Sequence, residues 1–257
     1  MTDYTLQELM VIEAARQIRD GDVVFVGTGL PLLATAFAQR THAPGLCFVV
    51  ETGAIAPLVV PTPISVSDPR ILHKAVRLGT LREVLGCLLQ RGLVDVGFLG
   101  GAQIDPFGNI NSTVIGDYAR PAVRLPGSGG ANDIASHARR LVIIATHEKR
   151  RFPPSCDYVT SPGYLHGPDG RQKAGLKVTH PGITVVTDLA VLEIDPATAR
   201  LRIARLMPGV SAGRVRDNTG FELGVAAPLG SVEPPSAEQL RVLREDVDPD
   251  GVYLKRR

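Results

Sequence analysis

A glutamate at the end of an apolar run is the residue of this sequence best suited to chemistry. Glu51 follows the run Leu46 to Val50 and precedes Thr52-Gly53. The run predicts a buried strand that ends at a glycine turn, and open α/β folds place their ligands at the carboxyl ends of such strands. A carboxylate there would be partly desolvated, and the adjacent glycine would let a substrate approach, as a nucleophilic or basic glutamate requires. A turn or helix-capping acid that only makes hydrogen bonds is the structural alternative.

A glycine-rich loop later in the chain could bind an anion. The loop Gly127-Ser128-Gly129-Gly130 leads into a predicted short helix. Its glycines leave the backbone amides unobstructed, and the helix adds its positive end. Such a loop can hold a phosphate or stabilise an oxyanion. A flexible surface turn is the alternative.

A second glycine pair stands between a predicted strand and a predicted helix. Backbone amides of Gly27, Thr28 and Gly29 at the helix start could bind an anion. The pair is not a dinucleotide fingerprint, because Leu32 stands where the third glycine belongs, and no Gly-Lys-Ser/Thr follows to make a P-loop. We favour a tight strand–helix turn here.

Two further segments carry polar side chains after predicted strands. Asn109, Asn111 and Ser112 could donate to a carbonyl oxygen, although hydrogen bonding within the turn is the usual role of such residues. The run from His147 to Phe152 resembles a catalytic cluster only superficially. We interpret it as a charged strand end with internal pairing.

Composition excludes several classes of function. Hydrophobic residues make up 44% and charged residues 21% of the 257 residues, which is typical of a globular protein. A net charge of +2, no basic block longer than Lys149-Arg150-Arg151 and the lack of Trp argue against nucleic-acid binding. The cysteines Cys47, Cys87 and Cys156 are isolated, which fits a reducing, cytoplasmic compartment. No metal-ligand spacing, membrane-spanning run or N-terminal secretion signal is visible.

Apolar strands alternate with helical patterns along the chain. This alternation predicts one α/β domain over residues 1–257, with an open, largely parallel, helix-covered sheet and a C-terminal hairpin turning at Asp195 to Thr198. Proline-rich residues 57–69 and the Gly-, Pro- and Lys-rich residues 162–182 are expected to be loops. The expected helices are 6–19, 31–40, 81–90 and 237–245, and the expected strands are 23–26, 46–50, 94–99, 110–113, 141–145, 183–187, 191–194 and 201–206.

These motifs together resemble one family, the β subunits of glutaconate CoA-transferase, which are class I CoA-transferases. The resemblance covers nearly the whole chain and implies the CoA-transferase (NagB/RpiA-like) fold. The run Gly-Gly-Ala-Gln-Ile-Asp-Pro-Phe-Gly-Asn-Ile-Asn-Ser-Thr is its most specific part. It fades between Ala54 and Phe98. The matching segments are Gly27 to Pro31, Glu51 to Gly53, Gly100 to Asp117, Gly127 to Asn132, His147 to Phe152, Asp157 to Gly163 and Asn218 to Phe221.

The resemblance implies a covalent mechanism centred on Glu51. In that family the matching glutamate attacks the acyl-CoA thioester, forms a mixed anhydride and then becomes a glutamyl-CoA thioester; Thr52 replaces the family's serine. Coenzyme A is implied as a substrate, with no permanently bound cofactor and no metal. The amides of Gly127, Ser128, Gly129 and Gly130 would line the CoA or oxyanion region, and the turn with Asn109, Asn111 and Ser112 would be a second lining. A weaker expectation places Gly27, Thr28, Gly29, Thr52 and Gly53 in the substrate pocket.

The resemblance also implies a partner and leaves alternatives open. A homologous α subunit is expected, in a heterodimer or a larger complex such as a heterotetramer or heterooctamer, and the acceptor would be a short carboxylic or dicarboxylic acid. Two alternatives remain: an acyl-CoA hydrolase or C–C bond-cleaving or decarboxylating enzyme on the same scaffold, and a non-catalytic CoA-binding subunit. No nucleic acid or membrane partner is expected.

Overall fold

The computed structural model describes residues 4–58, 63–65 and 67–254. Part of the predicted loop 57–69 and the first three residues of the N-terminus examined for a secretion signal lie outside these ranges. The chain divides into two compact units, Met1–Leu99 with Pro234–Arg257, and Gly100–Glu233. Each is described by itself, and the single domain remains a prediction. Within the described residues no helix is long and apolar enough to cross a membrane.

The first unit is built on strands in the order β5-β1-β2-β3-β4. The central strand β1 pairs in parallel with both β2 and β5, whereas β2, β3 and β4 pair antiparallel. Val24, Phe25, Phe48 and Val49 are buried, because these strands carry apolar residues on both faces. The bounds are β1 (Val23–Phe25), β2 (Cys47–Val49), β3 (Ala54–Ile55), β4 (Arg77–Leu78) and β5 (Val96–Leu99).

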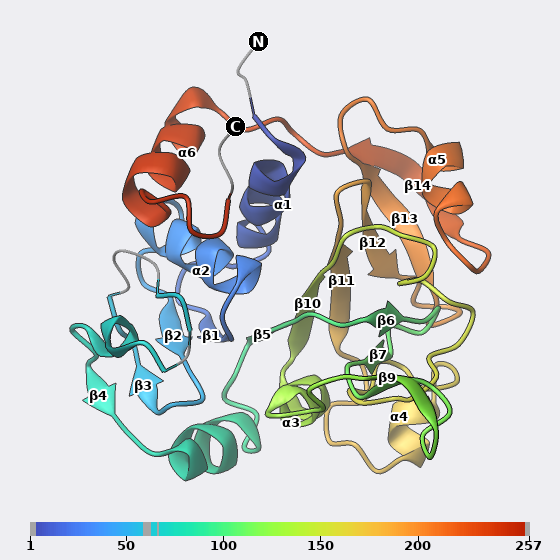
Figure 1. Ribbon diagram of the computed structural model, residues 1–257, viewed down its shortest axis with the longest axis horizontal. Helices are drawn as coiled ribbons and strands as arrows, with labels where there is room; N and C mark the ends of the chain where they lie inside the picture. The colour runs from blue at the N-terminus through green and yellow to red at the C-terminus, as the bar shows by residue number, and fades with distance from the viewer. Residues whose placement is uncertain (1–3, 59–62, 66, 255–257) are drawn as a thin grey trace. The chain divides into compact units, whose positions relative to one another are not determined.

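Helices from both ends of the chain pack together in this unit, with α1, α2 and α6 grouped on one side of β1 and β2 (Figure 1). Thr5 and Glu8 form a capping box at the start of α1. Arg244 pairs with Glu8 at 2.6 Å and so ties the C-terminal helices to α1. The bounds are α1 (Leu6–Ala15), α2 (Leu30–Arg40), η1 (Pro69–Leu72), η2 (Glu83–Leu89), α6 (Ala237–Arg241) and η3 (Val242–Val247).

The second unit has strands in the order β14-β13-β12-β11-β10. β10 pairs in parallel with β11 and β13 with β14, and β12 pairs antiparallel with both neighbours. The predicted hairpin is confirmed: the Asp195 carboxylate accepts from the backbone amides of Ala197 and Thr198 at its turn. The predicted α/β fold is confirmed as well. The bounds are β10 (Arg140–Ile144), β11 (Gly182–Val186), β12 (Ala190–Ile194), β13 (Leu201–Leu206) and β14 (Gly224–Ser231).

Shorter elements complete the second unit, and most were not predicted. Residues 162–182 were expected to be a surface loop, but they contain α4 and the buried side chains of Tyr164 and Arg171. That expectation was therefore wrong in part, because a polar composition does not exclude a guanidinium held inside by backbone carbonyls. The bounds are β6 (Gln103–Ile104), β7 (Ile110–Asn111), β8 (Val114–Gly116), β9 (Pro121–Arg124), α3 (Ala131–His137), α4 (Gly170–Lys173) and α5 (Ala212–Asp217).

Candidate active site

Glu51 lies just beyond the carboxyl end of β2, at the tip of the hairpin that joins β2 to β3. The Gly53 amide donates to the Val50 carbonyl at 3.0 Å, and the Val50 amide donates to the Ala54 carbonyl at 3.1 Å. Gly53 has φ +100°. These features define a three-residue hairpin loop, which commonly combines a turn with a glycine of positive φ. The loop presents Glu51 and Thr52 at its tip.

The Glu51 carboxylate takes no part in the hydrogen bonds and ion pairs that hold the described residues together. Its residue is half-buried, and it makes no hydrogen bond or ion pair with any residue that the structure describes. A turn or capping acid would instead accept hydrogen bonds from nearby backbone amides. Within the described residues, the carboxylate is therefore available to an incoming molecule.

Gly53 is required by the backbone of a neighbouring segment. A Cβ at this position would lie 2.1 Å from the Gly79 carbonyl oxygen, and the Gly79 amide donates to the Gly53 carbonyl at 2.9 Å. The expectation that this glycine makes room for a substrate needs correction, because Gly79 fills the space on the side where a Cβ would point. Gly53 therefore fixes the tip that carries Glu51.

We expect Gly53→Ala to destabilise the first unit by about 2 kcal/mol, because alanine disfavours the positive φ of this position and its Cβ would collide with the Gly79 carbonyl. Urea unfolding followed by circular dichroism measures this loss. Gly86→Ala is the matched control, because a Cβ at Gly86 meets no atom within 4 Å and its φ lies outside the positive region. Equal unfolding midpoints for the two variants would contradict the backbone explanation.

The Gly27–Gly29 turn lies at the same sheet edge as Glu51. β1 and β2 are parallel neighbours with Phe25 opposite Val49, and the Val26 amide donates to the Val49 carbonyl at 3.1 Å. The turn that follows β1 and the tip that follows β2 therefore share one edge. Gly29 caps α2 with φ +91°, which agrees with the favoured strand–helix turn. A Cβ on Gly27 would meet no atom within 4 Å, so the turn is open on that side.

The Gly127 loop and Ser112 lie together in the second unit. The Gly127 amide donates to the Ser112 carbonyl at 2.8 Å, and Ser112 Oγ donates to the Gly127 carbonyl at 3.0 Å. Gly127 and Gly129 have φ +93° and +49°, and a Cβ on either would meet no atom within 4 Å. Ser128 Oγ accepts from the Asn132 amide at 3.1 Å, which holds the loop to the first turn of α3. The loop is thus braced at its base and open above its glycines.

Asn109 and Asn111 shape the turn from which Ser112 projects. Both side chains are buried, with 1% and 0% exposure. Asn109 Nδ2 donates to Asp105 and to the Leu165 carbonyl, and its Oδ1 accepts from two backbone amides. Asn111 Nδ2 donates to Gln103 and to the Val114 carbonyl, and its Oδ1 accepts from two amides. We expected both side chains to donate to a substrate carbonyl, but each Nδ2 group already donates to two partners within the protein. The alternative, hydrogen bonding within the fold, is therefore the role that the structure shows.

Thr160 connects the two candidate linings and was not singled out from the sequence. Its Oγ1 accepts from the Ser112 amide at 2.9 Å and lies 2.7 Å from Thr113 Oγ1. Its carbonyl accepts from Asn132 Nδ2 at 2.9 Å. A lone threonine carries no sequence signal of such a role, because its partners come from segments distant along the chain.

His147 is a buried structural residue, in agreement with the interpretation of its segment. Its ring nitrogens lie 3.0 Å from the hydroxyls of Thr187 and Thr219, and the ring stacks on Phe152 with centroids 4.3 Å apart. Burial lowers the pKa of His147 to about 4. The imidazole is therefore neutral at physiological pH.

This burial predicts a pH-dependent stability. The His147 pKa rises to its ordinary value of 6.5 on unfolding, so the unfolded chain takes up a proton first as the pH falls. The stabilisation that the neutral His147 contributes is complete above pH 6.5 and is lost as the pH falls towards 4. We therefore expect this group to make the protein about 2 kcal/mol less stable at pH 5 than at pH 7. Urea unfolding at both pH values should show a smaller difference in His147→Gln. The exposed His166 provides the control, since His166→Gln should leave the difference unchanged.

The described residues contain no group of three or more His, Cys, Asp or Glu side chains that could hold a metal ion. The expected absence of a metal remains a prediction.

Comparison with known proteins gives consistent matches over the chain. The family model described as Coenzyme A transferase matches residues 8–218. The B-subunit of glutaconate CoA-transferase from Acidaminococcus fermentans is 40% identical, covering 99% of this chain and 96% of that protein. The B-subunit of 3-oxoadipate CoA-transferase from Pseudomonas knackmussii is 38% identical, covering 95% and 94%.

Solved structures of related proteins also match this chain over nearly its full length. The crystal structure of glutaconate coenzyme A-transferase from Acidaminococcus fermentans matches with a TM-score of 0.93 at 40% identity, covering 100% of this chain and 99% of that one. The decarboxylase AibA/AibB matches with a TM-score of 0.83 at 29% identity and covers 97% of each chain.

Proposed function

Because this chain belongs to the coenzyme A transferase family, we propose that it is the β subunit of a CoA-transferase that moves CoA between an acyl-CoA and a short carboxylic or dicarboxylic acid. The observation that carries the proposal is the Glu51 carboxylate, half-buried beyond a parallel strand and without a partner among the described residues. The two relatives named for glutaconate and 3-oxoadipate support a dicarboxylate as the acid.

In the proposed reaction Glu51 carries CoA between the two acids. A Glu51 carboxylate oxygen attacks the thioester carbonyl carbon, the C–S bond breaks, and CoA leaves as a thiolate from a mixed anhydride. The thiolate then attacks the Glu51 carbonyl carbon, which releases the donor acid and leaves a glutamyl-CoA thioester. The acceptor carboxylate repeats these steps in reverse. Each step exchanges a carboxylate and a thiolate, so no redox change is needed.

Other residues would supply electrostatic support for this exchange. In our proposal the amides of Ser128, Gly129 and Gly130 bind CoA, and Gly127 supports this loop because its own amide donates to the Ser112 carbonyl. Ser112 acts by bracing Gly127 at 3.0 Å. Thr52 at the hairpin tip and the Gly27–Gly29 turn line the acyl pocket. Exclusion of water would increase the reactivity of the carboxylate, because a solvated carboxylate is a weak nucleophile.

A homologous α subunit would complete the enzyme. Both relatives are named as the B-subunits of their transferases, which supports a heteromeric complex. We propose a heterodimer or a multiple of it, located in the cytoplasm, with CoA as a substrate and no permanently bound cofactor.

Mass spectrometry of the complex tests the proposal. The heteromeric enzyme is incubated with an acyl-CoA but no acceptor, and the peptide that carries Glu51 is examined for added CoA. We expect the adduct in the wild type and in Glu222→Gln, which removes an exposed carboxylate elsewhere, but not in Glu51→Gln. If no adduct forms and Glu51→Gln keeps full activity, the proposal fails. CoA binding with neither adduct nor turnover would instead support a non-catalytic role for this chain.

The likeness to a decarboxylase supports keeping a second candidate function. A hydrolase or C–C bond-cleaving enzyme would consume acyl-CoA when no acceptor acid is present. The discriminating measurement is multiple-turnover release of free CoA or CO₂ without acceptor. Without acceptor, a transferase should release about one equivalent of the donor acid per Glu51 and no lasting free CoA, because the CoA stays on the enzyme as the glutamyl thioester.

A further inference from the structure

Two tyrosines of the second unit are stacked on each other at the surface. Tyr118 lies in the turn between β8 and β9, and Tyr158 comes from a segment distant along the chain. Their ring centroids are 5.4 Å apart and the ring planes differ by 25°. The two residues are 58% and 40% exposed. An aromatic pair that the fold leaves exposed is suited to receive another planar group.

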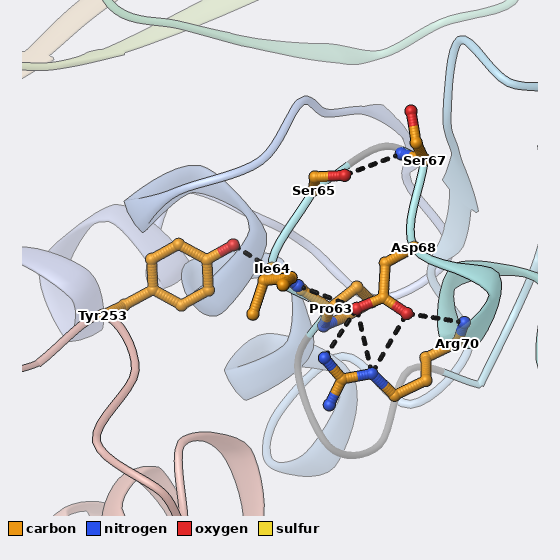
Figure 2. A network of polar contacts seen from close by, with 7 residues as sticks. All are labelled: Pro63, Ile64, Ser65, Ser67, Asp68, Arg70 and Tyr253. Atoms are coloured by element: carbon orange, nitrogen blue, oxygen red, sulfur yellow. Dashed lines mark hydrogen bonds and ion pairs between the residues drawn. The ribbon is translucent and has the colours of Figure 1, made fainter.

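Another tyrosine has a structural role that this pair lacks. Figure 2 shows the Tyr253 hydroxyl pointing at Pro63, and this hydroxyl donates to the Pro63 carbonyl at 2.7 Å. The hydroxyls of Tyr118 and Tyr158 make no hydrogen bond with any residue that the structure describes. Contacts within the described part of the chain therefore account for Tyr253 but not for the polar ends of the two exposed rings.

An arginine adds a cation to the stacked pair. The guanidinium carbon of Arg124, the last residue of β9, lies 4.9 Å from the centre of the Tyr118 ring. Arg124 Nη2 donates to the Tyr118 carbonyl at 3.0 Å. The residue is exposed, and its remaining donors have no acceptor among the described residues. A guanidinium held in place beside an aromatic ring is suited to bind a phosphate.

The hairpin of β8 and β9 continues directly into the Gly127 loop. Beyond β9 the Leu125 amide donates to the Thr113 carbonyl at 3.0 Å, and the Gly127 amide donates to the Ser112 carbonyl at 2.8 Å. Arg124 stands three residues before Gly127, so their Cα atoms are at most about 11 Å apart. The exposed cation and the open glycines therefore belong to one continuous surface segment.

The segment that carries Tyr158 is tied to the same hairpin and to the same loop. On one side of Tyr158, the Asp157 carboxylate accepts from the last backbone amide of β8 at 2.8 Å. On the other side, Thr160 Oγ1 accepts from the amide of Ser112, the residue that braces the Gly127 loop, at 2.9 Å. Hydrogen bonds on both sides of Tyr158 thus fix the stacked pair beside this loop.

We propose that this surface binds the nucleotide end of CoA, with the adenine stacked on Tyr158 and a phosphate paired with Arg124. The inference rests on the proposed transferase function, in which the Gly127 loop binds CoA. Adenine stacks on aromatic rings, and guanidinium groups pair with phosphates. Tyr118 supports the Tyr158 ring and holds Arg124. In CoA a diphosphate and a pantetheine chain separate the adenine from the thiol, so the nucleotide lies on the hairpin while the rest of the molecule passes the Gly127 loop.

An acyl-CoA and the matching acyl-pantetheine test the role of Tyr158, because both carry the same thioester and only acyl-CoA carries the nucleotide. In the complex with the α subunit we expect Tyr158→Leu to lower kcat/KM for acyl-CoA about tenfold, the effect of losing one base–aromatic stack. We expect kcat to stay within about twofold, since the stack acts in binding. The value of kcat/KM for acyl-pantetheine should equal that of the wild type. Tyr158→Phe keeps the ring and should retain most of the activity with acyl-CoA.

Arg124→Gln tests the phosphate contact with the same two substrates. We expect kcat/KM to fall about fivefold for acyl-CoA and to stay unchanged for acyl-pantetheine, because only acyl-CoA carries phosphates. Arg200→Gln is the matched control. Arg200 also lies over an aromatic ring, 5.3 Å from the centre of Phe107, but it belongs to neither the hairpin nor the Gly127 loop. Both substrates should therefore react with this variant as with the wild type.

The outcomes separate this inference from the proposed function. If the wild type forms the Glu51 adduct but Tyr158→Leu and Arg124→Gln use acyl-CoA as well as the wild type does, only the nucleotide site is overturned. Equal losses with acyl-CoA and acyl-pantetheine overturn it too, and a smaller fraction of assembled complex in size-exclusion chromatography would then assign the surface to the α subunit. Absence of the adduct from the wild type overturns the transferase proposal itself.

Discussion

Glu51→Gln is expected to lower CoA transfer by at least about a thousandfold, because a glutamine amide cannot form the mixed anhydride and the glutamyl-CoA thioester of the proposed mechanism. Folding should be preserved. The Glu51 carboxylate makes no hydrogen bond or ion pair with any described residue, so the substitution should change the free energy of unfolding by less than about 0.5 kcal/mol. Initial rates with saturating acyl-CoA and acceptor, together with urea unfolding, measure the two effects.

Glu51→Asp refines the same prediction. Aspartate keeps the carboxylate but withdraws it by one methylene, and misplacing a reacting group by about 1 Å costs on the order of a hundredfold in rate. We therefore expect activity between that of the wild type and that of Glu51→Gln. Glu222→Gln should behave as the wild type. A Glu51→Gln enzyme that retains more than about a tenth of wild-type activity would assign the chemistry to another group.

The position of Glu51 at a strand end could be predicted from the sequence, but the lack of a hydrogen-bond or ion-pair partner for its carboxylate among the described residues could not. The apolar run before it marks β2, and Gly53 marks the turn, so local pattern was enough to place the residue at a strand end. Whether a carboxylate has a partner depends on side chains brought near by the tertiary fold. Gly53 illustrates the same limit, since its need for glycine comes from Gly79, a residue in another segment.

The same reasoning explains the outcome for Asn109 and Asn111. Sequence offered two roles for them, donation to a substrate and hydrogen bonding within the fold, and each role uses the same amide groups. Their partners include Leu165 and Gln103, which no local pattern connects to them.

The strand β14 was not predicted, for a different reason. Gly224–Ser231 contains glycines and a proline and is largely exposed, so it lacks the alternation that marks a strand.

The second large effect is expected at Arg171, whose side chain is fully buried at 0% exposure. Burial lowers its pKa to about 10, so the guanidinium is still protonated at neutral pH. Its donors satisfy main-chain carbonyls of α3 and of the chain around α4. Two of these carbonyls belong to the last turn of α3, where helix carbonyls have no partner within the helix. The carbonyls are those of Ala135, Ser136, Pro162, Gly163 and Val178.

Arg171→Met should therefore destabilise the second unit by about 4 kcal/mol or more, because methionine fills most of the volume but leaves buried carbonyls without donors. Arg171→Lys should recover only part of this loss, since an ammonium cannot reproduce the planar fork of a guanidinium. Lys173→Met on the same helix is the control: its ion pair with Asp169 is exposed, so we expect less than about 0.5 kcal/mol. Urea unfolding of the three variants ranks them. Arg171 holds the end of the helix that begins at the Gly127 loop, so, if this loop binds CoA as we propose, Arg171→Lys should also weaken CoA binding. An Arg171→Met protein that unfolds at the wild-type midpoint would show that the carbonyls find other donors.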